Sequence, residues 1–262
     1  MSAAEQTFVI VGAGLAGAKA AEALRTDGFE GRVVLLGDEL DRPYDRPPLS
    51  KSYLQGTTER DKIYLHPPNW YTDHDVDLRV GTRVTALDRP AHEVRIEGGE
   101  RIGYDKLLLA TGSSPRRLDV PGADLDGVHY LRRVGDCESL QAAFAAGPRV
   151  VIVGAGWIGL ETAAAARAAG CQVTVVGRSK LPLLSVLGAE VAAIYAALHR
   201  AHDVELRLDT GVVEILGDGR NATGVLLTDG HVLDTDVIVV GIGITPNKIG
   251  RASCRERVYV LV

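Results

Sequence analysis

One glycine-rich turn occurs twice in this chain, each time between an apolar strand and an alanine-rich helix. The copies are FVIVGAGLAG at residues 8–17 and VVIVGAGWIG at residues 150–159. In a G-x-G-x-x-G turn the first glycine allows the bend, the second lets backbone N–H groups approach a pyrophosphate, and the third lets the helix pack on the sheet. The helix N-terminus adds free N–H donors and partial positive charge. Two copies in this context predict two dinucleotide sites, against the alternative of glycine turns that pack and bind nothing.

The length and the strand pattern predict two domains of one fold class. A chain of 262 residues is long enough for two domains with their own cores. Continuous apolar runs predict buried parallel strands at residues 7–11, 32–36, 106–110, 171–176 and 237–240. Gly28 and Gly170 are placed to end the two helices in a left-handed conformation. The predicted fold is α/β, with two Rossmann-like domains that meet near residues 113–115.

Composition excludes several classes of function. The net charge of −5 offers no basic stripe for nucleic acid. No apolar run reaches the ~20 residues that span a bilayer, and the N-terminus lacks the pattern of a signal peptide, so we expect a cytoplasmic protein without a membrane partner. Three cysteines without C-x-x-C spacing argue against disulfides and zinc. His199 and His202 could share a helix face, but we expect two solvated histidines and no metal site.

The residues after the second strand of each unit carry opposite charges. Asp38 follows the first unit's strand and can accept hydrogen bonds from ribose hydroxyls, which favours a cofactor with a free 2′-hydroxyl. Arg178 stands at the equivalent place in the second unit, where a guanidinium can pair with a 2′-phosphate. Two interpretations of Arg178 stay open: it favours NADPH over NADH, or it points into water.

Four further segments carry a family resemblance that covers nearly all of residues 8–247. They are RPYDRPPLSK (42–51), ATG (110–112), WIGLE (157–161) and GIGITPN (241–247). With the two turns, they make the chain resemble the FAD-dependent pyridine-nucleotide oxidoreductases, and among them the ferredoxin and rubredoxin reductases that feed bacterial oxygenases and cytochromes P450. The resemblance implies two three-layer ββα domains, as in glutathione reductase. Residues 1–114 would bind FAD, with a return near 244–248, and residues 115–243 would bind NADH or NADPH.

The resemblance also implies site residues. The FAD site would contain Gly12, Gly14, Leu15, Ala16, Gly17, Asp38, Lys51, Val84, Ala110, Thr111, Gly112 and Arg132. The NAD(P)H site would contain Gly154, Gly156, Trp157, Ile158, Gly159, Glu161, Arg178 and Gly243. Lys51 beside the flavin and Glu161 facing it would be the catalytic pair, although spacing alone leaves both as ordinary surface residues. The family usually ends the second unit's strand with Glu, where this chain has Gly177.

Cysteine placement separates the possible activities. Residues 38–62 contain no cysteine, whereas disulfide reductases and thiol-dependent oxidases or peroxidases need one near the flavin. The resemblance therefore favours electron transfer from NAD(P)H through FAD to a ferredoxin- or rubredoxin-type carrier. The alternatives are an NAD(P)H oxidase or disulfide reductase, and a nucleotide-binding fragment or relative of the apoptosis-inducing flavoproteins.

The C-terminal segment does not continue the family pattern. Residues 249–262 resemble a translated sequencing adapter, so we expect a non-native tail. The later Gly-Asp motif and the C-terminal interface domain of the family have no counterpart in this sequence. We therefore expect the polypeptide as written to bind FAD weakly or not at all.

Overall fold

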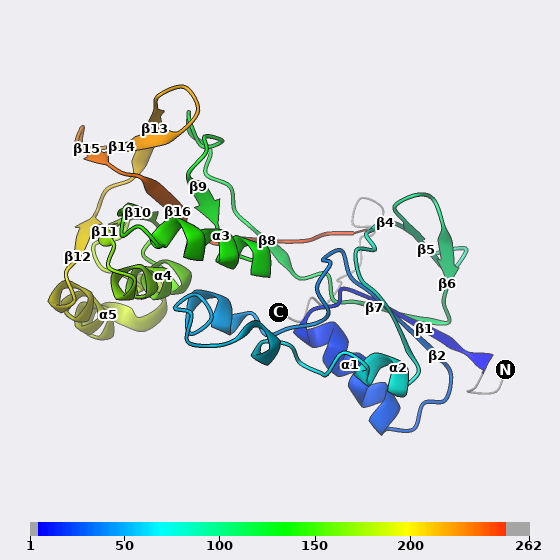
Figure 1. The fold of residues 1–262 in the computed structure, drawn as a ribbon. Helices are drawn as coiled ribbons and strands as arrows, with labels where there is room; N and C mark the ends of the chain where they lie inside the picture. The colour runs from blue at the N-terminus through cyan, green and yellow to red at the C-terminus, as the bar shows by residue number, and fades with distance from the viewer. Residues whose placement is uncertain (1–4, 250–262) are drawn as a thin grey trace. The chain divides into compact units, whose positions relative to one another are not determined.

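The computed structural model describes residues 5–249, which fold into two compact units (Figure 1). The first unit contains the chain up to Asp45, then Asp61–Ser114 and the segment that begins at Pro246, and the second contains Arg46–Arg60 and Pro115–Thr245. Each unit has its own parallel sheet and its own buried core. The predicted tail lies, apart from Ile249, outside the described residues.

The segment Arg46–Arg60 differs from the expected division, because it belongs to the second unit and not to a first domain of residues 1–114. The hydroxyl of Tyr53 donates to Glu138 at 2.8 Å, and Arg60 donates to the same carboxylate oxygen at 2.7 Å. Both contacts join residues far apart in the sequence, so no local pattern could reveal them.

The first unit is built on a parallel sheet with the strand order β3-β2-β1-β7. Its elements are β1 (Thr7–Val11), α1 (Leu15–Thr26), β2 (Arg32–Leu36), α2 (Trp70–Asp73), β3 (Val76–Arg79) and β7 (Lys106–Leu109). A separate antiparallel sheet contains β4 (Val84–Asp88), β5 (Glu93–Ile96) and β6 (Arg101–Gly103). Short elements near the divisions between units are η3 (Arg60–Lys62), β8 (Ser113–Pro115) and β17 (Ile244–Pro246).

Side-chain alternation along β1 makes this unit three layers thick. Val9 and Val11 pack in one cluster with Val84 and Val94 of the antiparallel sheet. Ile10 points to the opposite face, where it packs with side chains of α1 and α2. Because successive side chains of a strand point to opposite faces, a strand that is apolar throughout is buried on both sides.

The second unit repeats this architecture around the sheet β12-β11-β10-β16-β9. Its elements are η2 (Pro47–Ser50), β9 (Val128–Tyr130), α3 (Val134–Phe144), β10 (Arg149–Val153), α4 (Trp157–Ala168), β11 (Gln172–Gly177), α5 (Leu184–Ala201), β12 (Val204–Leu208) and β16 (Val237–Val240). The antiparallel sheet contains β13 (Val212–Gly217), β14 (Ala222–Leu227) and β15 (Val232–Asp234). It packs on the sheet face that carries Val151 and Val153, while α4 packs on β10 and β11 (Figure 1).

Both Rossmann helices end in the same way. Gly28 after α1 has φ +79° and Gly170 after α4 has φ +84°. In each case the glycine N–H and the next N–H donate to carbonyls of the last helical turn: Gly28 to Arg25 and Phe29 to Leu24, Gly170 to Arg167 and Cys171 to Ala166. This is the Schellman pattern. The predicted pair of Rossmann-like, three-layer domains is therefore confirmed.

Three observations complete the fold. In the second sheet β9 pairs with the outer side of β16, whereas in the described part of the first sheet β7 is the edge strand.

His199 is buried, so the expectation that it lies in solvent was wrong. Burial lowers the pKa of His199, and the charge of His202 lowers it further. No helix within residues 5–249 is long and apolar enough to cross a bilayer.

Candidate functional site

The first and third glycines of each turn are required by the chain's own packing. Gly12 has φ +116°, and a Cβ there would lie 2.0 Å from the carbonyl oxygen of Ala110. A Cβ at Gly17 would lie 1.9 Å from the carbonyl oxygen of Gly12. The second turn has the same constraints: Gly154 has φ +119° and a Cβ there would lie 2.3 Å from the Gly241 oxygen, and a Cβ at Gly159 would lie 1.9 Å from the Gly154 oxygen.

The middle glycine of each turn has no such packing role. Gly14 and Gly156 have extended backbone with φ −86° and −91°, which any residue adopts. A Cβ at either position would meet nothing within 4 Å. The open space lies at the N-cap of the following helix, and in neither helix does a side chain cap that end.

The first-turn N–H groups of these helices belong to residues named in the sequence analysis. They are Leu15, Ala16 and Gly17 in α1, and Trp157, Ile158 and Gly159 in α4. Helix N-termini with free donors and open approach suit a pyrophosphate. The residues present therefore fit one dinucleotide in each unit.

The two strand ends next to the turns have the same backbone arrangement and opposite charges. Gly37 follows β2, and a Cβ there would lie 2.6 Å from the Ala13 methyl. Gly177 ends β11, and a Cβ there would lie 2.9 Å from the Ala155 methyl. The next residue is exposed in both units, Asp38 in the first and Arg178 in the second.

Lys51 and Glu161 lie in the same unit and form an ion pair. Lys51 Nζ lies 2.8 Å from Glu161 Oε1, with 53% of the lysine side chain and 25% of the glutamate side chain exposed. The hydroxyl of Ser50 donates to the other carboxylate oxygen, Oε2, at 2.6 Å. Prolines 47 and 48 begin the short helix η2 that presents Ser50 and Lys51 to α4. Ser50 belongs to the 42–51 motif, from which no role for its side chain was predicted.

The predicted FAD-site residues Thr111 and Gly112 lie in a segment held by Asn247, within the first unit. The Thr111 hydroxyl donates to the Asn247 carbonyl at 2.7 Å, and Asn247 Nδ2 donates to the Thr111 carbonyl at 2.9 Å. The Asn247 N–H donates to Gly112, which has φ +63°. The hydroxyl of Ser114 donates to Asn247 Oδ1 at 2.7 Å. Asn247 belongs to the 241–247 motif, from which its contacts with residues 111–114 were not predicted.

The remaining predicted residues have structural surroundings of their own. Val84 is buried in the first unit's core. In the second unit the Arg132 carbonyl accepts from Arg46 at 2.6 Å, and the carbonyl of Gly243, which has φ +112°, accepts from the Arg116 N–H at 2.9 Å. Their contact with a cofactor stays a prediction.

The two cysteines within the described residues are poorly suited to thiol chemistry. Cys137 and Cys171 are both buried. Burial, followed by the charges of Glu138 and Asp136, raises the pKa of Cys137 to about 12. Burial also raises the pKa of Cys171. A thiol is nucleophilic as the thiolate, so neither cysteine is activated at neutral pH.

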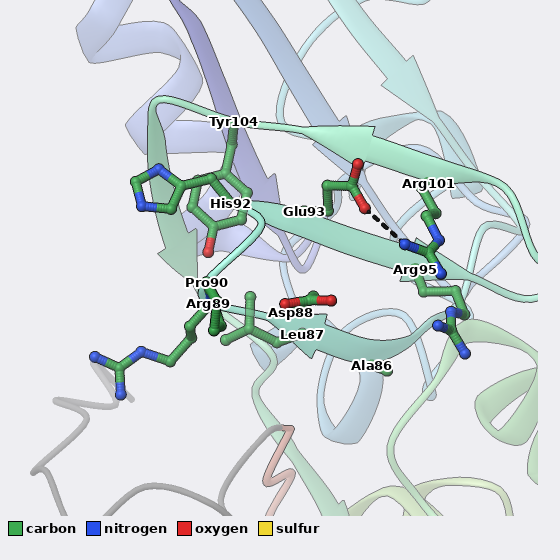
Figure 2. Close-up of a pocket in the computed structure, with 10 residues that line it drawn as sticks. All are labelled: Ala86, Leu87, Asp88, Arg89, Pro90, His92, Glu93, Arg95, Arg101 and Tyr104. Atoms are coloured by element: carbon green, nitrogen blue, oxygen red, sulfur yellow. Dashed lines mark hydrogen bonds and ion pairs between the residues drawn. The ribbon is translucent and has the colours of Figure 1, made fainter.

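An open cavity of about 740 Å³ lies on the antiparallel sheet β4-β5-β6 (Figure 2). Glu93 and Arg101 form an ion pair at 3.1 Å, which Figure 2 marks with a dashed line. The His92 and Tyr104 rings stack with centroids 5.5 Å apart. The cavity is lined by none of the predicted site residues, so its size does not mark it as the reaction site.

Comparisons with known proteins agree with this geometry. Rhodocoxin reductase of Rhodococcus erythropolis is 46% identical over 242 residues, which cover 92% of this chain and 56% of that protein. The putidaredoxin reductase chain in a crystal structure of the covalent putidaredoxin reductase–putidaredoxin complex matches with a TM-score of 0.89 and 38% identity, over 92% of this chain and 59% of that one. The ferredoxin reductase for the CYP199A2 system from Rhodopseudomonas palustris matches with a TM-score of 0.90 and 37% identity, over 93% and 60%.

The chain therefore spans between 56% and 60% of the length of these relatives. The family profile described as pyridine nucleotide-disulphide oxidoreductase matches residues 6–260. That match includes both glycine turns, the Lys51–Glu161 pair and the segment held by Asn247. The predicted resemblance is confirmed: the chain belongs to the pyridine nucleotide-disulphide oxidoreductase family.

Proposed function

We propose that the protein is a flavoprotein reductase that passes electrons from NAD(P)H through FAD to a ferredoxin- or rubredoxin-type carrier serving an oxygenase or a cytochrome P450. We further propose that it acts in the cytoplasm. The first unit would bind FAD and the second NAD(P)H. When bound, FAD supplies the conversion of a two-electron hydride donor into a source of single electrons.

The observation that carries the proposal is the duplicated turn with an open middle glycine. Gly14 and Gly156 leave space at an uncapped helix N-terminus in both units. Neither space is needed for packing, so a bound phosphate group explains both. Asp38 after β2 suits the free ribose hydroxyls of FAD.

The Lys51–Glu161 pair supplies the electrostatics. A lysine ammonium beside a flavin would stabilise the negative charge that the ring gains on reduction. Glu161 accepts from Lys51 on one oxygen and from Ser50 on the other. The carboxylate is thereby oriented from two sides, and it holds the Lys51 side chain in place.

Relatives support the choice of electron acceptor. One is named rhodocoxin reductase, one a ferredoxin reductase for a CYP system, and one was crystallised with putidaredoxin. The burial of Cys137 and Cys171 argues against the disulfide-reductase alternative within the described residues.

The test uses protein expressed from the native reading frame that contains residues 1–248. We expect this protein to copurify with FAD and its flavin absorbance to bleach on anaerobic addition of NADH or NADPH. We also expect cytochrome c reduction only when a [2Fe–2S] ferredoxin or a rubredoxin is added.

Two outcomes would overturn the proposal. The first is protein that holds flavin but does not bleach with either nucleotide. The second is rapid turnover of oxygen or a disulfide substrate without a carrier, which would favour the oxidase or disulfide-reductase alternative. A matched control is Arg200→Gln, an exposed charge on α5 outside the proposed sites, which should leave bleaching unchanged.

A further inference from the structure

The loop after β11 presents two cations and a hydroxyl where the nucleotide ribose is expected. Arg178, Ser179 and Lys180 are consecutive and all exposed. Neither Arg178 nor Lys180 has an ion pair or side-chain hydrogen bond among residues 5–249. Unpaired cations with a neighbouring hydroxyl are suited to an anion.

The backbone of this loop is held on both sides of Arg178. The Thr210 N–H donates to the Gly177 carbonyl at 3.1 Å, and the Asp209 N–H donates to the Ser179 carbonyl at 3.2 Å. Both donors lie just after the neighbouring strand β12. Asp209, the acidic residue of the two, therefore contacts the loop through its backbone N–H.

The Arg178 side chain runs across a glycine. A Cβ at Gly211 would lie 3.3 Å from Arg178 Nε and 3.7 Å from its Cγ. Gly211 is fixed in turn by Thr228, whose hydroxyl accepts from the Gly211 N–H at 3.0 Å. The Arg178 side chain therefore lies close to Gly211, and a Cβ at Gly211 would crowd its Nε.

The adjacent strand end carries no acidic side chain, because Gly177 stands where the family usually has Glu. A Cβ at Gly177 would lie 2.9 Å from the Ala155 methyl and 3.3 Å from Leu208 Cδ2. A side chain at this position would require Ala155 and Leu208 to shift. In the first unit, the residue equivalent to Arg178 is Asp38, so the same backbone carries opposite charges in the two units.

We infer that Arg178, Ser179 and Lys180 bind the 2′-phosphate of NADPH, and that NADPH is the reductant of this protein. This inference rests on the proposed function, because it assumes that the second unit binds a nicotinamide dinucleotide. A 2′-phosphate carries close to two negative charges at neutral pH. The planar guanidinium of Arg178 can donate two parallel hydrogen bonds to it.

The experiment measures nucleotide binding to the 262-residue chain by isothermal titration calorimetry. The ligands are NADPH, NADH, 2′,5′-ADP and 5′-AMP. Charge-assisted hydrogen bonds predict that NADPH binds about 10- to 100-fold more tightly than NADH, and 2′,5′-ADP more tightly than 5′-AMP. Quenching of Trp157, in the second turn, reports the same site once Trp70, the other of the chain's two tryptophans, is replaced by Phe.

Four variants separate the effect of charge on nucleotide binding from an effect on folding. Arg178→Gln should weaken NADPH binding to the affinity of NADH and should change the affinity for NADH by no more than about twofold. Arg178→Asp, which copies the first unit, should make NADH the tighter ligand. Gly211→Ala should weaken NADPH binding with Arg178 still present, because the new methyl would push the Arg178 side chain aside. Arg200→Gln removes a charge from the same unit and should change neither affinity.

The outcomes distinguish this inference from the proposed function. Wild-type chain that binds NADH as tightly as NADPH would overturn the 2′-phosphate site and leave the reductase proposal intact. Equal losses for both nucleotides in Arg178→Gln would do the same. Chain that is folded by circular dichroism but binds neither dinucleotide would overturn both.

Discussion

Two alanine substitutions in the second glycine turn, at Gly154 and Gly156, should separate the effect on packing from the effect on nucleotide binding. In Gly156→Ala the new methyl meets nothing within 4 Å, and φ −91° is allowed for any residue. The smaller unfolded-state entropy of alanine, worth about 0.4–1 kcal/mol, offsets its weaker N-capping. We therefore expect the free energy of unfolding to stay within about 1 kcal/mol of the wild type.

Gly154→Ala should behave in the opposite way. Its methyl would lie 2.3 Å from the Gly241 carbonyl oxygen, at φ +119°. Strained backbone costs about 1–3 kcal/mol and overpacking about the same. The sum of roughly 2–6 kcal/mol is a large part of the ~5–15 kcal/mol that stabilises a typical domain. We expect a clear drop in the midpoint of urea unfolding.

Nucleotide affinity completes the comparison. In Gly156→Ala the methyl would occupy the open space at the N-cap of α4, where we propose that the pyrophosphate binds. Loss of one charge-assisted hydrogen bond, about 1.5–3 kcal/mol, predicts NADPH binding weaker by about 10- to 100-fold. Calorimetry and urea unfolding on the same preparations test both halves. If Gly156→Ala bound NADPH like the wild type, or Gly154→Ala were equally stable, the division of roles between these glycines would be refuted.

Three further predictions concern other residues of the described chain. Lys51→Met in the native-locus protein should slow flavin bleaching by NAD(P)H at least tenfold. The free energy of unfolding should change by under about 1 kcal/mol, because exposed ion pairs contribute little to stability. An unchanged bleaching rate in stopped-flow measurements would contradict the role of the Lys51–Glu161 pair. Burial, and then the hydrogen bond to Glu138, raises the pKa of Tyr53 from 10.0 to about 12. The protonated Tyr53 therefore stabilises the folded state fully below pH 10, and this contribution is lost as the pH rises toward 12. The difference in unfolding free energy between wild type and Tyr53→Phe should shrink over that range, and a constant difference would contradict the prediction. Asn247→Ala should lower the unfolding free energy by about 1–2 kcal/mol through lost hydrogen bonds, and stability equal to the wild type in urea would show that this residue does not hold the 111–114 segment.

Local patterns in the sequence were enough to predict much of the fold. The apolar runs at residues 7–11, 32–36 and 237–240 coincide with β1, β2 and β16. Gly28 and Gly170 end their helices in the left-handed conformation that was expected. These features succeed because strand burial, helix ends and glycine turns depend on residues within a few positions of each other.

Long-range packing accounts for what local patterns missed. His199 was expected in solvent, but α5 turns it toward the interior, which its neighbours in sequence do not reveal. Residues 46–60 precede the predicted domain boundary, yet their partners on α3 and α4 lie in the second unit. Asn247 holds a segment more than a hundred positions earlier in the chain.

The sequence by itself determined the two Rossmann-like units, their glycine-rich turns and the opposite charges of Asp38 and Arg178, because each is a property of a short stretch of chain. Only the tertiary structure showed that Ser50 and Lys51 contact different oxygens of Glu161, that the middle glycines face open space, and that the Arg178 side chain lies close to Gly211. Those arrangements depend on contacts that form only when distant segments pack together, and their free energy is invisible in any local pattern.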